Sequence, residues 1–352
     1  MRPTEIVTLD SLNPHEAELK KAARLLNRGR LVIIPTETVY GIAANMHDRR
    51  AVERLYEIKK RPKDKPFTLH IEDKAKVEEF ARDIPIAAYK LIDAFWPGPL
   101  TIILKSKING SIGLRMPDNE IALKIIAYAR VPIVCPSANI SGQSAPFSFA
   151  QAIKDLDGLV DFAIDAGSTR FKTESSVVDL TVEPALVMRE KAISKQEIEA
   201  VAKRKTVLFI CTGNSCRSVM AQWLLEKKLK ELGRLDVEVL SAGIMMGGLG
   251  ATEATRRLLA QEGIDVSKHR SQRITRDLIR KSDIILVMER RHEENVLDIA
   301  PQAKNRVFLL KEFAKIKDND LDITDPISKS DEFYARIFNL IKDAVDTVSK
   351  II

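Results

Sequence analysis

The sequence predicts a protein of the α/β class built from two unlike domains. Its 352 residues exceed what one hydrophobic core usually covers. Two segments, which begin near Leu31 and Thr206, each carry a short β-branched run, then a turn, then an amphipathic helical pattern. The two halves share no repeated motif and no low-complexity tract interrupts either of them. The chain is therefore interpreted as a fusion of different domains and not as a duplication.

The boundary between the domains is expected at a short helix. Residues 193–205 have amphipathic helical spacing and end in three consecutive basic residues, a pattern that fits an interdomain linker. We expect a first domain over residues 1–194, a linker over 195–205 and a second domain over 206–352.

Composition and charge narrow the class of protein. Lys and Arg outnumber Asp and Glu by 56 to 49, and the net charge of +7 favours polyanionic partners such as nucleotides or RNA. On charge alone a solvated basic surface explains this excess equally well. No stretch approaches the roughly 20 uninterrupted apolar residues of a membrane span. The first residues also lack the pattern of an export signal, so we expect a cytoplasmic protein with no membrane partner.

The chain has only three cysteines, Cys135, Cys211 and Cys216, which are too few and too unevenly spaced for a disulfide framework. Each cysteine must therefore serve either core packing or chemistry. Cys135 ends an apolar run and is expected in the core.

The opening of the second half predicts a phosphate-binding loop. An apolar strand over residues 206–210 leads into Cys-Thr-Gly-Asn-Ser-Cys-Arg (211–217), and a helical pattern follows. Gly213 and Asn214 tolerate positive φ, so the backbone N–H groups of the loop can converge on one anion at the helix N-terminus. The same field would stabilise Cys211 as a nucleophilic thiolate near neutral pH.

Three further residues would complete a phosphatase mechanism. Arg217 offers a planar fork to two phosphoryl oxygens, and Ser218 can donate a hydrogen bond to the sulfur. Asp325, in a turn stiffened by Pro326, is the candidate acid for the leaving group. A structural cysteine with a surface arginine is the alternative. The position of Cys211 directly after an apolar strand argues against it.

Residues 211–218 resemble the Cys-x5-Arg-Ser loop of the low-molecular-weight protein tyrosine phosphatase family. Further family segments at 240–243, 263–271, 282–288 and 325–326 occur in the same order and extend the resemblance over residues 206–350. The resemblance implies a doubly wound parallel sheet, a phosphocysteine intermediate on Cys211, Arg217 as the phosphate clamp, and Asp325 as acid and then base, without a metal. It places these residues in the phosphate loop: Thr212, Gly213, Asn214, Ser215, Cys216 and Ser218. It also implies a reversible disulfide between Cys211 and Cys216.

The substrate of this half stays open between phosphotyrosine and phosphoarginine in a phosphorylated protein. Tyrosine phosphatases of the family usually have a bulky apolar residue at the position of Ser215, whereas their arginine phosphatase relatives have threonine. Ile327 stands where an aromatic residue often stacks on phosphotyrosine. An arsenate reductase would need further resolving cysteines, and none follows Cys216.

In the first half, basic and polar residues follow predicted helices and strands. A helix over residues 51–60 ends beside Lys59 and Arg61, which could hold phosphates or a carboxylate. Complementation of the helix dipole explains such a cluster equally well. Ser137 and Asn139 follow the apolar strand 131–135, where ligand loops usually lie.

These segments resemble the Sua5/YrdC/YciO family over residues 12 to about 194. The matching motifs are Pro-Thr-Glu-Thr-Val-Tyr-Gly (35–41), Lys-x-Arg-Pro (59–62), Pro-Gly-Pro-Leu-Thr (97–101), Pro-Ser-Ala-Asn-x-Ser-Gly (136–142) and Ser-Ser-Val-Val-Asp (175–179). The resemblance implies an open twisted α/β fold with a large basic cavity. It implies conversion of L-threonine, bicarbonate and ATP, accompanied by Mg²⁺, into threonylcarbamoyl-AMP for the t6A modification of tRNA. The tRNA-modification machinery and tRNA itself are then candidate partners.

Mapped residue by residue, the resemblance implies ATP and threonine contacts from Thr36, Lys59, Arg61, Ser137 and Asn139, with phosphate or carboxylate contacts from Arg115, Ser176 and Arg189. The usual C-terminal domain of Sua5 is replaced by the phosphatase-like half. A non-catalytic module that binds RNA or nucleotide is the alternative function for the first half.

Overall fold

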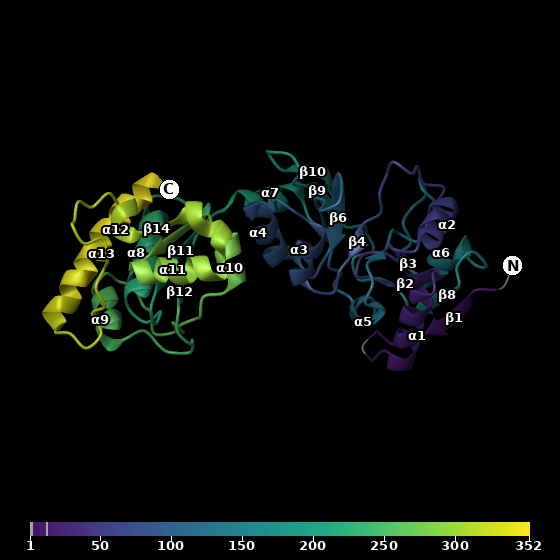
Figure 1. The fold of residues 1–352 in the computed structure, drawn as a ribbon. Coiled ribbons are helices and arrows are strands. Elements are labelled where there is room, and N and C mark those ends of the chain that lie inside the picture. The colour runs from purple at the N-terminus through teal and green to yellow at the C-terminus, as the bar shows by residue number, and fades with distance from the viewer. Residues whose placement is uncertain (1–2, 12) are drawn as a thin grey trace. The chain divides into compact units, whose positions relative to one another are not determined.

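The protein is described by a computed structural model over residues 3–11 and 13–352. These residues form two compact units that divide between Ala202 and Lys203 (Figure 1). The first unit contains a mixed sheet and the second a parallel sheet, so the predicted α/β class is confirmed.

The first unit is built on a ten-stranded mixed sheet with the order β1-β8-β2-β3-β7-β4-β6-β5-β9-β10. Its strands are β1 (Glu5–Thr8), β2 (Val32–Ile34), β3 (Gly41–Asn45), β4 (Leu69–His70), β5 (Leu100–Lys105), β6 (Ser111–Arg115), β7 (Ile133–Val134), β8 (Phe162–Asp165), β9 (Ser176–Asp179) and β10 (Leu186–Arg189). Its helices are α1 (Glu16–Asn27), α2 (Arg49–Lys59), the 3-10 turn η1 (Lys74–Lys76), α3 (Val77–Phe80), α4 (Ile86–Phe95), α5 (Glu120–Ala129), α6 (Phe149–Lys154) and α7 (Lys195–Lys203).

The two faces of this sheet bury separate apolar cores. Side chains alternate across a strand, so Val32 and Ile34 of β2 join one cluster while Ile33 joins the other. Leu19 of α1 packs in the first cluster, and Leu55 of α2 packs in the second. With helices on both faces, the strand ends are left to carry polar loops.

Helix α7 differs from the linker that the sequence predicts over 195–205. It is helical, but Ile198 is fully buried in the core of the first unit. The apolar face of α7 therefore belongs to the first unit, and the second unit begins at Lys203.

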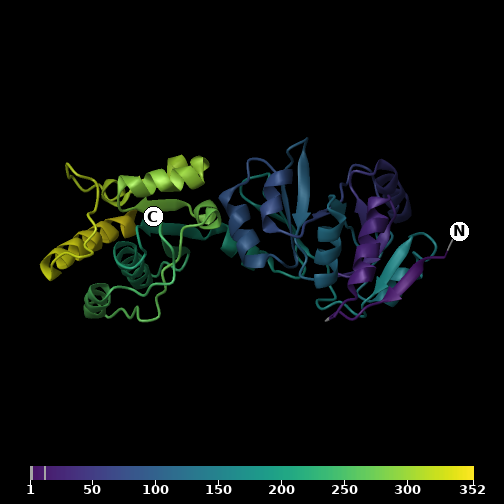
Figure 2. The same cartoon turned by 60° about the horizontal axis from the view of Figure 1, so that its bottom comes forward.

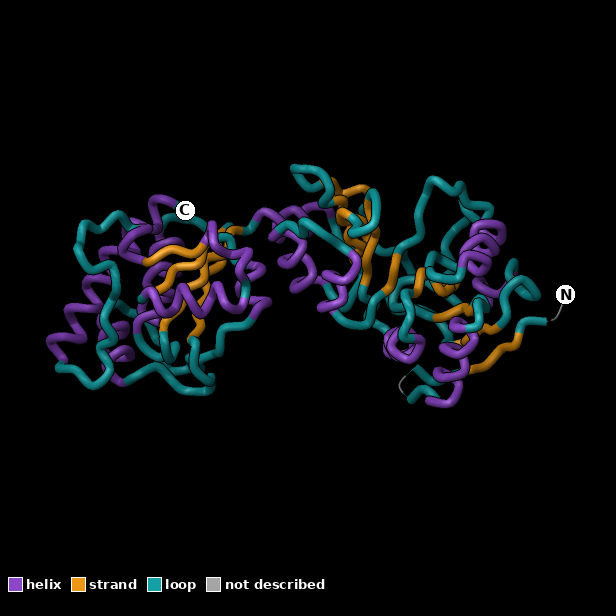
Figure 3. The backbone as a smooth tube through the Cα atoms, viewed as in Figure 1, coloured by secondary structure: helices purple, strands orange, loops and turns teal. Residues whose placement is uncertain are grey.

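The second unit has a four-stranded, all-parallel sheet in the order β12-β11-β13-β14 (strands orange in Figure 3). Its strands are β11 (Lys205–Cys211), β12 (Val237–Gly243), β13 (Ile284–Val287) and β14 (Val307–Leu309). Its helices are α8 (Arg217–Glu231), α9 (Glu253–Gln261), α10 (Arg276–Lys281), α11 (Arg290–Ile299), the 3-10 helix η2 (Pro301–Arg306), α12 (Leu310–Phe313) and α13 (Asp331–Ile351).

Both faces of the parallel sheet are covered, as Figure 2 shows. Val207 and Phe209 of β11 pack toward α8 and α13, while Leu208 and Ile210 pack toward α10 and α11. This is the doubly wound arrangement that the sequence predicts. Because β12 and β13 flank β11 on opposite sides, the carboxyl end of β11 lies at the switch point where such sheets bind ligands.

In residues 3–11 and 13–352, the helices are all too short or too polar to cross a membrane. The same residues contain no group of three or more His, Cys, Asp or Glu side chains arranged to hold a metal ion.

Candidate functional site

The first unit contains a cavity, partly open to solvent, where several chain segments end. Thr36 follows β2, Arg61 lies two residues beyond α2, and Ser137 follows β7. Arg115 and Arg189 are the last residues of β6 and β10. All five are predicted from the sequence to contact ATP or threonine, and all five line this cavity.

Lys59 and Asn139 line an adjoining hollow that shares Arg61, Ser137 and Arg189 with the cavity. The Lys59 side chain is buried, and its Nζ donates to the carbonyl oxygens of Ser137 at 2.5 Å and Asn139 at 2.7 Å. Burial, with a smaller contribution from the charge of Arg61, lowers the pKa of Lys59 to about 8. Lys59 therefore holds the 137–139 loop in place as well as lining the hollow.

Arg115 is held by a buried ion pair. Its Nη2 donates to Glu37 Oε1 at 2.7 Å and to Thr38 Oγ1 at 2.8 Å, and both charged side chains are almost fully buried. These bonds fix the guanidinium in one orientation at the cavity wall.

Arg189 is fixed by the segment before β9. Its Nη1 donates to Glu174 Oε1 at 2.7 Å, its Nε to the carbonyl of Ser175 at 2.9 Å and its Nη2 to Ser175 Oγ at 3.1 Å. Burial lowers the pKa of this guanidinium, and the Glu174 carboxylate opposes that shift. Glu174 and Ser175 line the cavity together with Arg189.

The prediction for Ser176 is corrected by the structure. Its side chain is fully buried, and its Oγ accepts the N–H groups of Lys191 and Ile193 and donates to the carbonyl of Ile193. Ser176 ties the chain after β10 to β9, while its neighbour Ser175 faces the cavity.

Two residues that line the cavity, His70 and Glu174, were not predicted from the sequence. His70 lies on the two-residue strand β4, which is too short to show a period, and lines the cavity. Burial and the nearby Arg115 charge lower the pKa of His70 to about 3, so its ring is neutral at physiological pH. Glu174 directly precedes the recognised motif at 175–179, and that adjacency was the available signal.

In the second unit the predicted loop follows β11 directly. Cys211 is the last residue of β11, and Asn214 has the positive φ of 50° that the sequence predicts for this turn. The Cys211 sulfur accepts the N–H of Asn214 at 3.3 Å and lies 3.0 Å from Ser218 Oγ. Because Asn214 Nδ2 donates to that Oγ, the Ser218 hydroxyl proton is available to the sulfur.

Asn214 also fixes the loop to the strands and loops around it. Its Nδ2 donates to Ser241 Oγ at 2.8 Å, and its Oδ1 accepts the N–H of Gln272 at 3.0 Å. The backbone carbonyl of Asn214 contacts the ring of His269 at 2.8 Å. These bonds from distant segments hold the curl of the loop, so its geometry does not depend on a bound anion.

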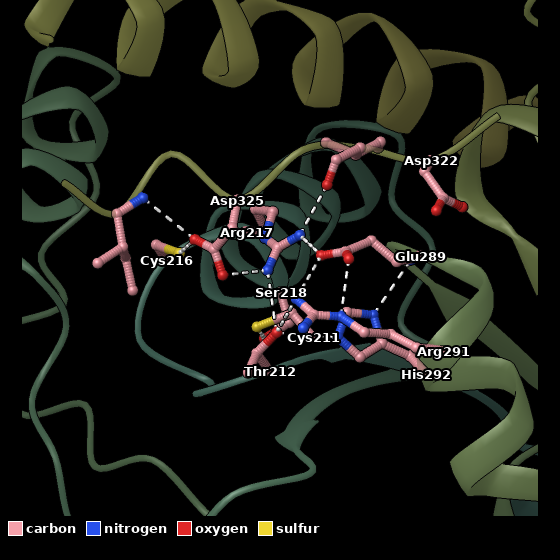
Figure 4. A network of polar contacts seen from close by, with 12 residues as sticks. Cys211, Thr212, Cys216, Arg217, Ser218, Glu289, Arg291, His292, Asp322 and Asp325 are labelled. Atoms are coloured by element: carbon pink, nitrogen blue, oxygen red, sulfur yellow. Dashed lines mark hydrogen bonds and ion pairs between the residues drawn. The ribbon is translucent and has the colours of Figure 1, made fainter. Parts of the chain in front are cut away.

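Arg217 is fully buried and lies between two carboxylates (Figure 4). Its Nη1 pairs with Glu289 and donates to the carbonyl of Ile323 at 2.7 Å. Its Nη2 pairs with Asp325 and donates to Thr212 Oγ1 at 3.2 Å. The structure therefore brings the predicted clamp and the predicted acid into direct contact.

The residues that follow β13 were not predicted from the sequence as part of this site. Glu289 is the N-cap of α11, and Arg291 and His292 lie in its first turn, where all three contact Thr212 or Arg217. They follow the recognised 282–288 segment directly, at the carboxyl end of a parallel strand, where ligand loops gather.

The chain matches two protein-family models. Residues 24–191 match the Sua5/YciO/YrdC model, described as telomere recombination, and residues 206–352 match the model for low molecular weight phosphotyrosine protein phosphatase.

Curated relatives match the first unit. A threonylcarbamoyl-AMP synthase from Pyrococcus abyssi is 43% identical over 195 residues, which cover 53% of this chain and 57% of the relative. This chain thus spans less than two thirds of that protein. A putative threonylcarbamoyl-AMP synthase from Methanocaldococcus jannaschii is 35% identical over 205 residues, which cover 55% of this chain and 96% of the relative.

Among solved structures, Pyrococcus abyssi Sua5 complexed with L-threonine has a TM-score of 0.54 at 27% identity, with 87% of this chain and 99% of that chain covered. The chain belongs to the Sua5/YciO/YrdC family in its first unit and to the low-molecular-weight phosphotyrosine protein phosphatase family in its second.

Proposed function

We propose that the first unit makes threonylcarbamoyl-AMP from L-threonine, bicarbonate and ATP, as a step toward t6A in tRNA. The observation that carries this proposal is the cavity wall, which Arg61, Arg115 and Arg189 line together with Ser137. The printed names of the relatives, and the L-threonine bound to Pyrococcus abyssi Sua5, support the same reaction.

The reaction brings several anions together, and the residues act mainly by positioning and charge neutralisation. The amine of threonine takes up the bicarbonate carbon to form a carbamate with loss of water. A carbamate oxygen then attacks the α-phosphorus of ATP, and pyrophosphate leaves. The arginines at the cavity wall would bind the carboxylate and the phosphates during these steps.

Magnesium would enter with ATP. Among the described residues that line the cavity, the one carboxylate is that of Glu174, and it pairs with Arg189, so the cavity offers the ion few free acidic ligands. This donor set fits an Mg²⁺ ion that is held chiefly by phosphate oxygens. The ion would supply charge neutralisation on the phosphates.

The purified full chain, supplied with Mg²⁺-ATP, L-threonine and bicarbonate, should yield threonylcarbamoyl-AMP and pyrophosphate by mass spectrometry. An Arg115→Met variant should lose most of this product, whereas the phosphatase variant Cys211→Ser should retain it. A chain that binds tRNA but forms no product would instead support the non-catalytic RNA-binding function.

We propose that the second unit hydrolyses a phosphorylated protein side chain through Cys211. The sulfur attacks phosphorus and forms a phosphocysteine, while Asp325 gives its proton to the leaving group. Water, deprotonated by Asp325, then breaks the S–P bond and releases inorganic phosphate. The contact between Arg217 and Asp325 over the Cys211 loop carries this proposal.

The substrate is either phosphoarginine or phosphotyrosine, and one comparison of peptide hydrolysis distinguishes the two. Ser215 is buried in the loop, and Ile327 is 45% exposed near Asp325. Hydrolysis of a phosphoarginine and a phosphotyrosine peptide by the full chain should be compared, with Cys211→Ser as the blank. Selective phosphoarginine turnover that Ser215→Ile removes would assign recognition to Ser215, whereas preference for phosphotyrosine would make Ser215 a neutral replacement.

A further inference from the structure

Three N–H groups converge on the hydroxyl oxygen of Thr212, the residue that follows the nucleophile. His292 Nε2 lies 3.0 Å from Oγ1, Arg291 Nη2 donates at 3.1 Å and Arg217 Nη2 donates at 3.2 Å (Figure 4). Two of these three residues come from the first turn of α11.

The direction of the histidine bond follows from its second ring nitrogen. Nδ1 of His292 accepts the backbone N–H of Glu289 at 3.1 Å, so Nε2 carries the ring proton and donates to Thr212. The ring is fully buried. Burial, together with the adjacent Arg217 charge, lowers the pKa of His292 to about 4, so the ring stays neutral with this tautomer at physiological pH.

The Thr212 hydroxyl is thereby made a donor. A hydroxyl oxygen has two lone pairs and one proton, and the lone pairs are taken by the converging N–H groups. The proton must therefore bond to something else. Among the hydrogen bonds of residues 3–11 and 13–352, none gives this proton a protein acceptor.

Both lone pairs of Thr212 Oγ1 stay occupied when Arg217 binds a phosphate. If Arg217 turns to clamp the phosphoryl oxygens, His292 and Arg291 still fill both lone pairs of Thr212 Oγ1. Arg291 is itself held by Glu289, at 2.7 Å from Nε to Oε2. The hydroxyl proton then remains directed at an acceptor other than these three residues.

We propose that the Thr212 hydroxyl donates a hydrogen bond to a phosphoryl oxygen of the substrate and of the phosphocysteine, and that His292 is the positioning residue that enforces this donation. The inference rests on the proposed phosphatase activity of the second unit. It assigns to the Thr212 hydroxyl a phosphoryl contact in addition to those of the loop backbone and Arg217.

The test uses the full chain with an aryl phosphate as substrate and inorganic phosphate as a competitive inhibitor. Thr212→Val, which keeps the shape and removes the hydroxyl, should lower kcat/KM by about 10- to 100-fold and weaken phosphate inhibition. Thr212→Ser should keep most of the activity. A matched Thr206→Val change, at the opposite end of β11 from Cys211, should leave both quantities unchanged.

The role of His292 is tested by a double-mutant cycle. His292→Leu should reduce kcat/KM to nearly the level of Thr212→Val, and the double variant should be no worse than Thr212→Val alone. His292→Gln, which can place an amide N–H near the position of Nε2, should restore part of the loss. Multiplicative losses in the double variant, or full activity in Thr212→Val, would overturn the inference.

Two further results separate this inference from the function on which it rests. If the wild-type chain does not exceed Cys211→Ser on the aryl phosphate, the proposed phosphatase activity fails. Titration calorimetry with inorganic phosphate then decides the inference, because Thr212→Val should bind phosphate more weakly than wild type, and equal binding would overturn it. If His292→Leu does not fold, the contrast between Thr212→Val and Thr212→Ser decides it.

Discussion

At the scale of single residues, Arg217 carries one positive charge but pairs with two carboxylates. Its buried guanidinium pairs with Glu289 through Nη1 and with Asp325 through Nη2, whereas Nε has no partner among the described residues. A phosphate that binds Nη1 or Nη2 therefore has to displace one of these carboxylates. Glu289 is also paired with Arg291 and is the less exposed of the two. Asp325, on a loop and 27% exposed in its side chain, is the partner expected to withdraw.

An Asp325→Asn variant should therefore have opposite effects on turnover and on phosphate affinity. The leaving group loses its acid, so kcat for a substrate with a poor leaving group should fall by about 10²- to 10³-fold. Arg217 loses a competing anion, so the inhibition constant for inorganic phosphate should decrease. Steady-state kinetics with phosphate as inhibitor measure both quantities.

The control is Asp322→Asn on the same loop. Asp322 Oδ1 accepts the N–H of Arg290 and does not contact Arg217, so both quantities should stay near wild type. Weaker phosphate inhibition in Asp325→Asn would contradict the displacement of Asp325 by phosphate.

A second residue-scale prediction concerns oxidation. Burial, with smaller contributions from the nearby Cys211 and Asp325 charges, raises the pKa of Cys216 to about 12, so Cys216 is a thiol at neutral pH. Peroxide should oxidise Cys211 to a sulfenic acid, and condensation with the Cys216 thiol should release water and form a disulfide. Activity should then return with dithiothreitol in wild type and stay lost in Cys216→Ser. Equal recovery of the two proteins would exclude the disulfide.

At the scale of elements, the end of β12 supports the phosphate loop through a glycine. A Cβ placed on Gly243 would lie 2.8 Å from the backbone N of Asn214 and from the carbonyl O of Thr212. These are backbone atoms of the loop and cannot yield without moving it. Strand β12 therefore needs glycine at its last residue because the phosphate loop packs directly on its backbone.

Gly243→Ala should disrupt the loop while the rest of the chain stays folded. We expect aryl phosphatase activity to fall by at least about 100-fold, since small displacements of a catalytic group have effects of this size. Formation of threonylcarbamoyl-AMP should be unchanged. Gly250→Ala is the matched control, because a Cβ there meets no atom within 4 Å. Comparable phosphatase activity in both variants would show that the loop tolerates the displacement.

At the scale of the whole molecule, each unit contains a buried histidine that is kept neutral. The pKa of His70 is lowered to about 3 in the first unit, and that of His292 to about 4 in the second, in both cases mainly by burial. In the unfolded chain both rings titrate near pH 6.5, at about the ordinary value. Between these folded and unfolded values the unfolded chain binds more protons, so the free energy of unfolding decreases as pH falls.

Both units should therefore lose stability below about pH 6.5, by an amount on the order of 5 kcal/mol for His70 and 3 kcal/mol for His292 once the pH reaches the folded values. Each unit has one tryptophan, Trp96 in the first and Trp223 in the second. Urea unfolding followed by fluorescence in a Trp223→Phe background reports the first unit, and Trp96→Phe reports the second. His70→Gln and His292→Gln should each flatten the pH dependence of their own unit only.

The sequence by itself determined the local parts of this protein. The phosphate loop is continuous in sequence, and its apolar strand, Asn214 and the following helix are sufficient to predict its curl. The roles of Cys211 and Arg217 stay predictions. In the first unit, polar residues that follow a predicted helix and strand identified Arg61 and Ser137 of the cavity wall, and the family resemblance added Thr36, Arg115 and Arg189. Apolar patterning also separated the two units, because each must bury its own core.

Only the tertiary structure decided what surrounds these parts. Glu289 and Asp325 lie 72 and 108 residues from Arg217, and only the parallel crossovers bring them together. Ser175 and not Ser176 faces the cavity because side chains alternate along β9, and the sequence contains two adjacent serines with no indication of the register. Helix α7 packs on the first unit because Ile198 is buried in that core. In each case the deciding quantity was the direction of a side chain relative to a distant segment, which local patterns do not encode.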